Sequence, residues 1–209
     1  MLNKKEFKKI GPMKLPCLLR DGKIVEFKLH TYKFPNEEEY YVLEKGDVRK
    51  LKNPLVRIHS ACSFAQVFGS QRCDCKFQLD ESMTKIAKEG GLIIYIWSHE
   101  GRGIGKWNHT KVYMEQDKGE DTVTAYEVLD LPIDQRNYSN AIKILKDYEF
   151  KEIRLLTNNP RKINPFEGSG IKVTRIPLVA KVDKYNESQI KIKISKLGHY
   201  SDIVNNKNK

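Results

Sequence analysis

The sequence predicts a mixed α/β fold (α+β), with an N-terminal part rich in strands and a central sheet flanked by helices. Two observations support this expectation. Between Leu15 and Val56, short apolar segments alternate with turn residues, which is typical of strands. From Gln78 onward, segments with helical periodicity alternate with apolar runs of strand length. Because no internal repeat or low-complexity linker divides the 209 residues, we expect a single domain over 1–209, with flexible ends at 1–9 and 200–209.

The N-terminal strands are indicated by two apolar segments, Lys23–Leu29 and Tyr40–Leu43. Turn residues separate these segments from their neighbours, at Asp21-Gly22, Pro35-Asn36 and Gly46-Asp47. Short connections of this kind join strands that pair in sequence order. We therefore expect a meander or a small barrel before Val56.

A helix followed by a buried strand is predicted in the middle of the chain. Apolar residues recur at helical spacing over Gln78–Glu89, and Gly90-Gly91 ends the pattern. Leu92–Trp97 is a continuous apolar run, which favours a buried central strand. It leads into Ser98–Gly105, where three glycines in five residues allow the backbone to approach a ligand closely. A plain tight turn would use glycines as well.

The second half of the chain continues this alternation of helices and strands. We expect one helix over Lys106–Lys118 and another from Ser139, which is an N-cap candidate. Strands are expected at Glu152–Thr157 and Lys172–Val179, and the tail from Lys184 has room for one more helix.

The composition limits the class of partner. A formal charge of +11 favours anionic partners, either a nucleic acid or a small polyphosphate, although scattered lysines are more commonly a solvated surface. The first residues lack the apolar core of a signal peptide, and no apolar run is long enough to cross a bilayer. We expect a cytoplasmic protein with no membrane partner. Its four cysteines suit a reducing compartment, where clustered cysteines more often bind metal than form disulfides.

Three of the cysteines predict a metal site. Cys62, Cys73 and Cys75 fall within a short stretch, and the last two can chelate one ion from an extended turn. Three protein ligands leave one position of a tetrahedral zinc ion open for chemistry. The alternative is a set of buried free thiols or a disulfide, although Cys73 and Cys75 are too close to bridge comfortably. Cys17 has no cysteine or histidine nearby in the sequence.

Two further polar clusters are candidates for function. Asp134 and Arg136 stand two residues apart ahead of a predicted helix. As surface residues they would form an ordinary ion pair worth less than about 1 kcal/mol. The strand that ends at Thr157 leads into two asparagines, a proline and Arg161-Lys162. Open α/β sheets bind ligands at such strand ends.

The order and spacing of these motifs resemble the GTP cyclohydrolase II family. The resemblance covers Leu15 to His199, including Asn186-Glu187 and Lys196-x-Gly198-His199 in the tail. Its main motifs are Arg57-Ile-His-Ser60, Cys62, Arg72-Cys-Asp-Cys75, Phe77-Gln-Leu79, Glu100-Gly-Arg-Gly-Ile-Gly105, Asp121-Thr-Val123, Asp134-x-Arg136 and Arg154-Leu-Leu-Thr-Asn-Asn-Pro160-x-Lys162.

The resemblance implies an enzyme of riboflavin biosynthesis that hydrolyses GTP. The products would be 2,5-diamino-6-(5-phosphoribosylamino)pyrimidin-4-one, formate and diphosphate, and the enzyme would be a homodimer with one Zn²⁺ per subunit and Mg²⁺ on the triphosphate. By the same resemblance, Cys62, Cys73 and Cys75 hold zinc, Asp134 is the proton acceptor, Arg136 the nucleophile, and Tyr113 governs completion of ring opening. The residues implied in nucleotide binding are Arg57, Ile58, His59, Ser60, Gln78, Glu100, Gly101, Arg102, Thr122, Thr157 and Lys162.

The chemistry of the reaction explains why such residues are needed. Zinc with an open position lowers the pKa of bound water towards neutrality, which favours attack on the imidazole ring. Three thiolates leave a net negative charge, which nearby donors must compensate, and Arg72 and His59 are candidates. A guanidinium has no free lone pair at neutral pH, so a charge clamp on the departing diphosphate is a physically easier role for Arg136 than that of nucleophile.

The chain departs from the family pattern at several positions beside these motifs. Ala61 stands where the family has Glu, Phe64-Ala65-Gln66 replaces Thr-Gly-Asp, His99 replaces Gln, and Tyr126 replaces Asn. The loss of two carboxylates makes the region more positive and removes a possible magnesium ligand.

These departures keep two alternatives open. The first is a divergent homologue that stops at a formamidopyrimidine product or acts on another purine nucleotide. The second is a basic zinc module that binds nucleic acid, which would need a fourth zinc ligand and leaves the Glu100–Gly105 loop and the Asp134/Arg136 pair unexplained.

Overall fold

The computed structural model describes residues 6–180 and 182–203. Within these ranges the chain forms two compact units. Unit 1 comprises residues 6–59, 79–97 and 137–178, and unit 2 comprises 60–78, 98–136, 179–180 and 182–203. Of the ends expected to be flexible, 1–5 and 204–209 lie outside the described residues, whereas Lys8 and Lys9 belong to the first strand.

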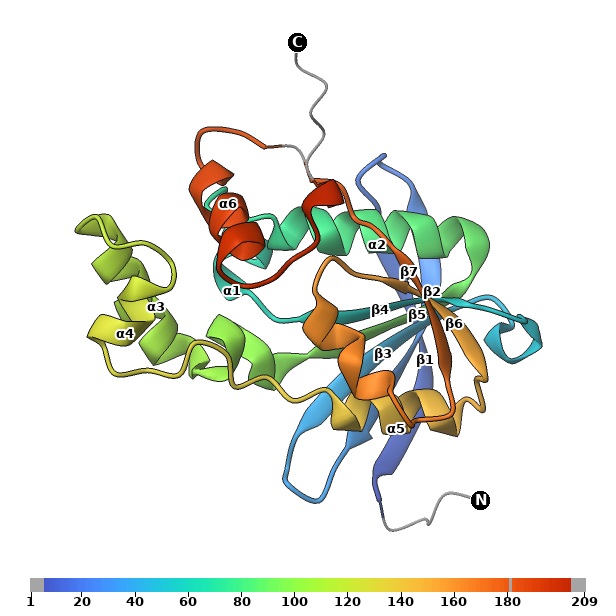
Figure 1. Ribbon diagram of the computed structural model, residues 1–209. Helices are drawn as coiled ribbons and strands as arrows, with labels where there is room; N and C mark the ends of the chain where they lie inside the picture. Colours follow the sequence, from blue (N-terminus) through green and yellow to red (C-terminus); the bar gives the residue numbers. More distant parts are fainter. Residues whose placement is uncertain (1–5, 181, 204–209) are drawn as a thin grey trace. The chain divides into compact units, whose positions relative to one another are not determined.

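A mixed sheet of seven strands is the main feature of the described chain, ordered β1-β2-β3-β5-β4-β6-β7 (Figure 1). β1 to β3 form an antiparallel meander and β3 pairs with β5, whereas β4, β6 and β7 run parallel. The expected meander is confirmed, and the sheet is open rather than a small barrel. The strands are β1 (Lys8–Leu18), β2 (Ile24–Lys33), β3 (Glu39–Lys45), β4 (Leu55–Ser60), β5 (Gly91–Ile96), β6 (Glu152–Leu156) and β7 (Lys172–Ile176).

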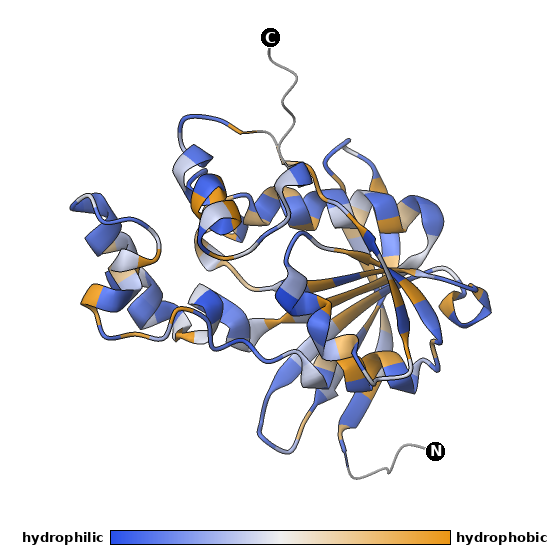
Figure 2. Cartoon of the chain, viewed as in Figure 1, coloured by the Kyte–Doolittle hydropathy of each residue, from blue (hydrophilic) through white to orange (hydrophobic). Residues whose placement is uncertain are grey.

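Helices cover both faces of this sheet, with α2 (Cys75–Glu89) on one side and α5 (Ser139–Asp147) on the other (Figure 1). β5 contributes side chains to the cores on both faces of the sheet, because successive side chains of a strand point in opposite directions. Leu92 and Ile94 join the core beneath α5, whereas Ile93 packs with Ile86 of α2. Figure 2 shows the hydrophobic residues concentrated in the strands. Burial of each such aliphatic side chain contributes about 1.5–3 kcal/mol to the stability of the fold. The predicted mixed α/β fold is confirmed.

The centre of the sheet requires a glycine at the start of β5. Gly91 has φ +144°, and a Cβ atom there would lie 1.9 Å from the carbonyl oxygen of Leu55 in the neighbouring β4. The two backbones therefore approach too closely for any larger residue. This packing brings β4, which leads to the first cysteine of the cluster, against β5, which leads to the glycine-rich loop.

The start of one helix and the N-cap of another differ from the sequence prediction. α2 begins at Cys75 rather than Gln78, so the third cysteine lies in its first turn. α5 begins at Ser139 as predicted, but its N-cap is Tyr138 rather than Ser139, whose backbone amide donates to Asn137 Oδ1 at 2.8 Å. The remaining helices are α1 (Ser63–Gln66), α3 (Gly105–Asp117), α4 (Thr124–Val128), α6 (Glu187–Ser195) and the 3₁₀ helices η1 (Val48–Lys50), η2 (Trp97–Gly103), η3 (Pro160–Lys162), η4 (Asn164–Phe166) and η5 (Ser201–Ile203). Within the described ranges, none of these helices combines the length and apolar character needed to span a membrane.

Candidate metal centre and nucleotide-binding residues

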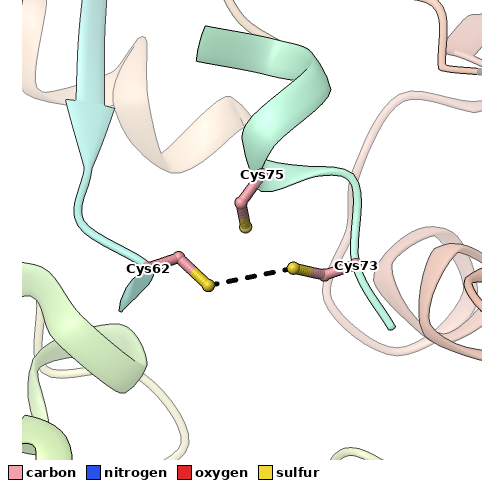
Figure 3. A group of neighbouring side chains, drawn as sticks. All are labelled: Cys62, Cys73 and Cys75. Carbon is pink, nitrogen blue, oxygen red and sulfur yellow. Dashed lines mark hydrogen bonds between the residues drawn. The ribbon is translucent and has the colours of Figure 1, made fainter. Parts of the chain in front are cut away.

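The three clustered cysteines converge in unit 2, with their sulfur atoms pointing toward one another (Figure 3). Cys62 follows β4, Cys73 lies in the loop before α2, and Cys75 opens that helix. All three sulfurs lie within 4.8 Å of one another, and none forms a disulfide. The structure thus brings the predicted ligand set together and contradicts the disulfide alternative.

The spacing of the sulfurs suits a tetrahedral ion. Cys62 Sγ and Cys73 Sγ are 3.8 Å apart. Two sulfurs bound to one tetrahedral zinc at about 2.3 Å are separated by about 3.8 Å. Hydrogen bonds from the Cys62 and Cys75 thiols favour the thiolate of Cys73 and hold its pKa well below the usual value. In the described residues, no fourth Cys, His or carboxylate joins the cluster, so a bound ion would keep an open position.

A buried carboxylate stands between two of the cysteines. Asp74 is 3% exposed and accepts hydrogen bonds from Gln78 Nε2 and Lys193 Nζ, each at 2.6 Å. Gln78, implied in nucleotide binding by the resemblance, therefore supports the loop that carries Cys73 and Cys75. Lys193 lies in α6, 119 positions from Asp74 in the sequence. Local sequence motifs therefore could not predict this ion pair. Arg72, the expected compensating cation, instead donates to Asp117 at 2.7 Å.

Glu100 of the glycine-rich loop is fixed by two hydrogen bonds from protein groups. Its Oε1 lies 2.7 Å from His109 Nδ1, and its Oε2 accepts the backbone amide of Ser63 at 2.7 Å. Burial alone would raise the pKa of Glu100, but these contacts with His109 and Ser63 outweigh it and lower the pKa. The carboxylate therefore stays ionised at neutral pH and links the loop to α3 and α1.

The two residues that follow Glu100 adopt left-handed backbone conformations. Gly101 has φ 58°, and a Cβ there would lie 2.7 Å from that of His109. Arg102 has φ 60°, which is strained for a residue with a side chain. Its guanidinium lies 5.2 Å from the ring centre of Tyr126, whose hydroxyl donates to Gly101 O at 3.1 Å. Within the described residues, Arg102 Nη1 is buried without a hydrogen-bond partner, and burial lowers the pKa of this arginine.

Asp134 and Arg136 form a bidentate pair. Arg136 Nε donates to Asp134 Oδ1 at 2.9 Å, and Nη2 donates to Oδ2 at 2.7 Å. The Asp134 and Arg136 side chains are only 6% and 13% exposed, respectively, so this is not the ordinary surface ion pair of the simpler interpretation. The remaining nitrogen, Nη1, donates to Ser60 Oγ at 3.4 Å, and the same hydroxyl lies 3.3 Å from His99 Nδ1. The predicted binding residue Ser60 thus contacts the predicted catalytic pair through Arg136.

An apolar pocket with aromatic walls includes Tyr113. Phe64 of α1 packs edge-on against Tyr113 of α3, with ring centres 5.0 Å apart, and stacks on His109 at 4.6 Å. The guanidinium of Arg72 lies 4.5 Å from the centre of the Tyr113 ring. Burial, reinforced by the three nearby thiols, raises the pKa of Tyr113, which keeps its hydroxyl protonated. Phe68, Ser70, Thr110, Met114 and Asp117 complete the lining.

Thr122 is the remaining predicted binding residue in unit 2. It is 5% exposed and lies just ahead of α4. Its neighbour Asp121 accepts the amides of Val123 and Thr124 at 2.7 and 3.0 Å and pairs with Lys196 Nζ at 2.5 Å. The Asp121-Thr-Val123 motif therefore builds a turn that fixes Thr122.

The other predicted binding residues belong to unit 1, where they surround the ends of β4 and β6. Arg57 Nη1 donates to Leu156 O at 2.8 Å, and Lys162 Nζ donates to Ile58 O at 2.8 Å. His59 stacks on Tyr95, and its burial next to Arg57 and Lys162 lowers its pKa well below the usual value, so the ring is neutral. Arg57, Ile58, His59, Thr157 and Lys162 are all at most 4% exposed.

Comparison with known proteins identifies the family. A profile described as GTP cyclohydrolase II matches residues 17–177, which include parts of both units. The chain belongs to the GTP cyclohydrolase II family. It is 40% identical to the GTP cyclohydrolase-2 of Picrophilus torridus over 175 residues, covering 83% of this chain and 91% of that protein. The resemblance inferred from the motifs is thereby confirmed, and so is the fold class.

Longer relatives match only part of their length. The riboflavin biosynthesis protein RibBA of Aquifex aeolicus is 44% identical over 176 residues, which cover 83% of this chain and 43% of the relative. The RibBA of Chlamydia trachomatis is 39% identical over 198 residues, 93% of this chain and 46% of the relative. The chain thus spans less than half the length of these two RibBA proteins.

Proposed function

We propose that this chain is a zinc-dependent hydrolase that opens the imidazole ring of GTP and releases formate and diphosphate. The third product would be 2,5-diamino-6-(5-phosphoribosylamino)pyrimidin-4-one, as expected for GTP cyclohydrolase II, and the pathway would be riboflavin biosynthesis. The observation that carries this proposal is the trio of free cysteines in a chain of this family: their sulfurs lie within 4.8 Å of one another, and those of Cys62 and Cys73 have the separation expected around a tetrahedral zinc ion.

Cys62, Cys73 and Cys75 would hold the zinc ion. When bound, zinc with one open position acts as a Lewis acid and lowers the pKa of water, which the weakly electrophilic purine carbon needs. The chain supplies the surroundings of that ion. Asp74 fixes the loop that carries two of the cysteines through its ion pair with Lys193, and the Tyr113 hydroxyl, kept protonated by burial, can donate a hydrogen bond from the aromatic pocket.

Arg102 and Arg136 are suited to bind phosphate oxygens in unit 2. The buried Arg102 Nη1 has no hydrogen-bond partner in the described chain, and an uncompensated donor of this kind favours an anionic ligand. Arg136 is held by both oxygens of Asp134, which stabilises its positive charge. This pairing supports a charge clamp on departing diphosphate over a nucleophilic role, because a charged guanidinium has no free lone pair.

The buried cations of unit 1 support binding of a polyphosphate. Arg57 and Lys162 donate to backbone carbonyls, and neutral His59 lies beside them. A triphosphate offers the negative charge that two such cations favour, and Mg²⁺ would share that charge. Thr157 Oγ1, which accepts the Asn159 amide at 3.1 Å, adds a hydroxyl at the same strand end.

The alternatives differ in product or partner. Phe64 stacks on His109 and the Tyr126 hydroxyl donates to Gly101 O. These two departures from the family pattern are the reason to test for a formamidopyrimidine product or another purine substrate. The nucleic-acid alternative needs a fourth zinc ligand, and the described residues offer none at the cluster. The family resemblance supports a homodimer, and a reducing cytoplasm would keep the three thiols available for metal.

The decisive experiment combines metal analysis with product analysis. The purified protein is incubated with GTP and Mg²⁺, zinc is measured by elemental analysis, and products are identified by mass and by formate assay. We expect one zinc per chain, formate and the diaminopyrimidine. Cys75→Ser should remove both zinc and turnover, whereas Cys17→Ser, outside the cluster, should retain both. A mass corresponding to added water alone would indicate the formamidopyrimidine product, and absence of zinc in the parent would reject the proposal.

A further inference from the structure

An ion pair from the C-terminal helix lies beside the cysteine cluster. Lys193 Nζ is 2.6 Å from Asp74 Oδ1, although the residues are 119 positions apart in the chain. The Asp74 and Lys193 side chains are 2% and 12% exposed, respectively. The second oxygen of Asp74 accepts Gln78 Nε2. Because Asp74 stands between Cys73 and Cys75, this contact brings a buried positive charge to the loop that carries two of the three thiols.

The position of Lys193 is set by the packing of α6. Ile190 and Ile194 of this helix pack with Ala180 and with Phe77, which lies in the first part of α2. Residues three positions apart in a helix lie on the same face, which places Lys193 beside Ile190. The lysine is therefore held by an apolar contact that is independent of its charge. Lys191, in contrast, has a side chain that is 71% exposed and pairs with Glu187.

The charges near the cluster require such a cation. Three thiolates around a divalent ion leave a net charge of minus one, and Asp74 adds a second negative charge next to them. Buried negative charge is costly unless a cation compensates it. Burial alone would lower the pKa of Lys193, but Asp74, Cys75 and Cys73 outweigh burial and raise it, so the lysine remains charged.

We propose that Lys193 is a positioning residue of the metal centre, whose charge stabilises the thiolates of Cys73 and Cys75 around a divalent ion. The inference rests on the proposed zinc site. It assigns a role to Lys193, which is neither a metal ligand nor one of the residues proposed to contact the substrate. It predicts that the C-terminal helix contributes to metal affinity although it carries no ligand. Residues that support metal ligands typically change metal affinity by about 10- to 100-fold when they are replaced.

Zinc affinity of the full chain tests this role directly. Lys193→Met keeps the length and apolar stem of the side chain but removes its charge, and Lys191→Met is the matched control on the same helix. Competition with a chromophoric chelator should show zinc affinity about 10- to 100-fold weaker in Lys193→Met and unchanged in Lys191→Met. Equal zinc affinities in Lys193→Met and the parent would overturn the inference, whereas a parent that binds no zinc would instead refute the proposed function.

Measurements in an Asp74→Asn variant distinguish an effect of Lys193 on the thiolates from simple pairing with Asp74. Asp74→Asn removes the carboxylate at nearly constant shape, and the double variant Asp74→Asn/Lys193→Met leaves no unpaired charge that would prevent folding. If Lys193 acts on the thiolates, its replacement still weakens zinc binding several-fold in the Asp74→Asn background. If Lys193 only balances Asp74, its replacement costs nothing there, and the inference fails. Far-ultraviolet circular dichroism of the metal-free proteins checks that each variant is folded.

Discussion

Glu100 Oε1 and His109 Nδ1 lie 2.7 Å apart, and the opposite oxygen of the same carboxylate accepts the Ser63 amide at 2.7 Å. The family resemblance implies that Glu100 binds the nucleotide, yet both of its oxygens already have protein partners. Glu100 therefore ties α1 and α3 to the loop that carries Arg102. We therefore expect Glu100 to affect substrate binding through the neighbours that it holds in place.

Replacing this carboxylate should affect stability as well as substrate binding. Glu100→Gln removes the negative charge that strengthens the hydrogen bonds with Ser63 and His109. We expect the free energy of unfolding to fall by about 1–3 kcal/mol and KM for GTP to rise. Urea unfolding and steady-state kinetics measure the two effects, with Glu127→Gln on the exposed side of α4 as control. Weaker substrate binding at unchanged stability would mean that Glu100 contacts the nucleotide directly.

The buried pair of Asp134 and Arg136 leads to a prediction about diphosphate. Arg136→Ala removes the guanidinium that Asp134 holds, and we expect diphosphate release to be abolished while zinc content is unchanged. Arg136→Lys should restore little, because an ammonium cannot span both oxygens of Asp134. Diphosphate is measured enzymatically, and Arg20→Ala at the surface is the control. Release at the parent rate from Arg136→Ala would exclude both the clamp and the nucleophile.

Local patterns were sufficient for most of the fold but not for short or irregular segments. The apolar run at Leu92–Trp97 predicted β5, because a buried strand needs no partner to be recognised. α1 and α4 were not predicted, since helices of four and five residues are too short for periodicity to show. The start of α2 was missed for another reason: Cys75 and Lys76 carry no helical signal of their own, and the loop that gathers the cysteines sets where the helix begins.

In the candidate site too, the sequence predicts features that depend on neighbouring residues but not contacts between distant ones. The spacing of Cys73 and Cys75 is local, so the sequence could predict that these cysteines form a cluster. The sequence could not predict the partners of Asp74 and Glu100, because tertiary packing brings Lys193 and His109 to them. Arg72 was assigned to charge compensation by proximity in sequence alone, and it turns instead toward Asp117 and Tyr113.

The pH dependence of stability should carry a contribution from Asp121. Hydrogen bonds from Lys196 and from the Thr124 and Val123 amides lower the pKa of this carboxyl to about 2. Since the unfolded value is about 3.9, the stabilisation is fully present above that pH and is lost as the pH falls towards 2. Asp121→Asn should therefore be less stable than the parent at pH 6, with the difference shrinking below pH about 4. Urea unfolding across this range measures it, and a pH-independent difference would contradict the assignment.

Tyr113 provides the test of how far the ring-opening reaction proceeds. Its ring contacts Phe64, His109 and Arg72 without using the hydroxyl, so Tyr113→Phe preserves the packing of the pocket. Because burial and the nearby cysteines keep that hydroxyl protonated in the parent, its removal takes away a hydrogen-bond donor. We expect Tyr113→Phe to keep its thermal stability and zinc but to accumulate a product in which water has added and formate has not left. Mass spectrometry of the products, alongside a formate assay, measures this shift. Full formate yield from Tyr113→Phe would show that the aromatic ring alone fulfils the role of this position.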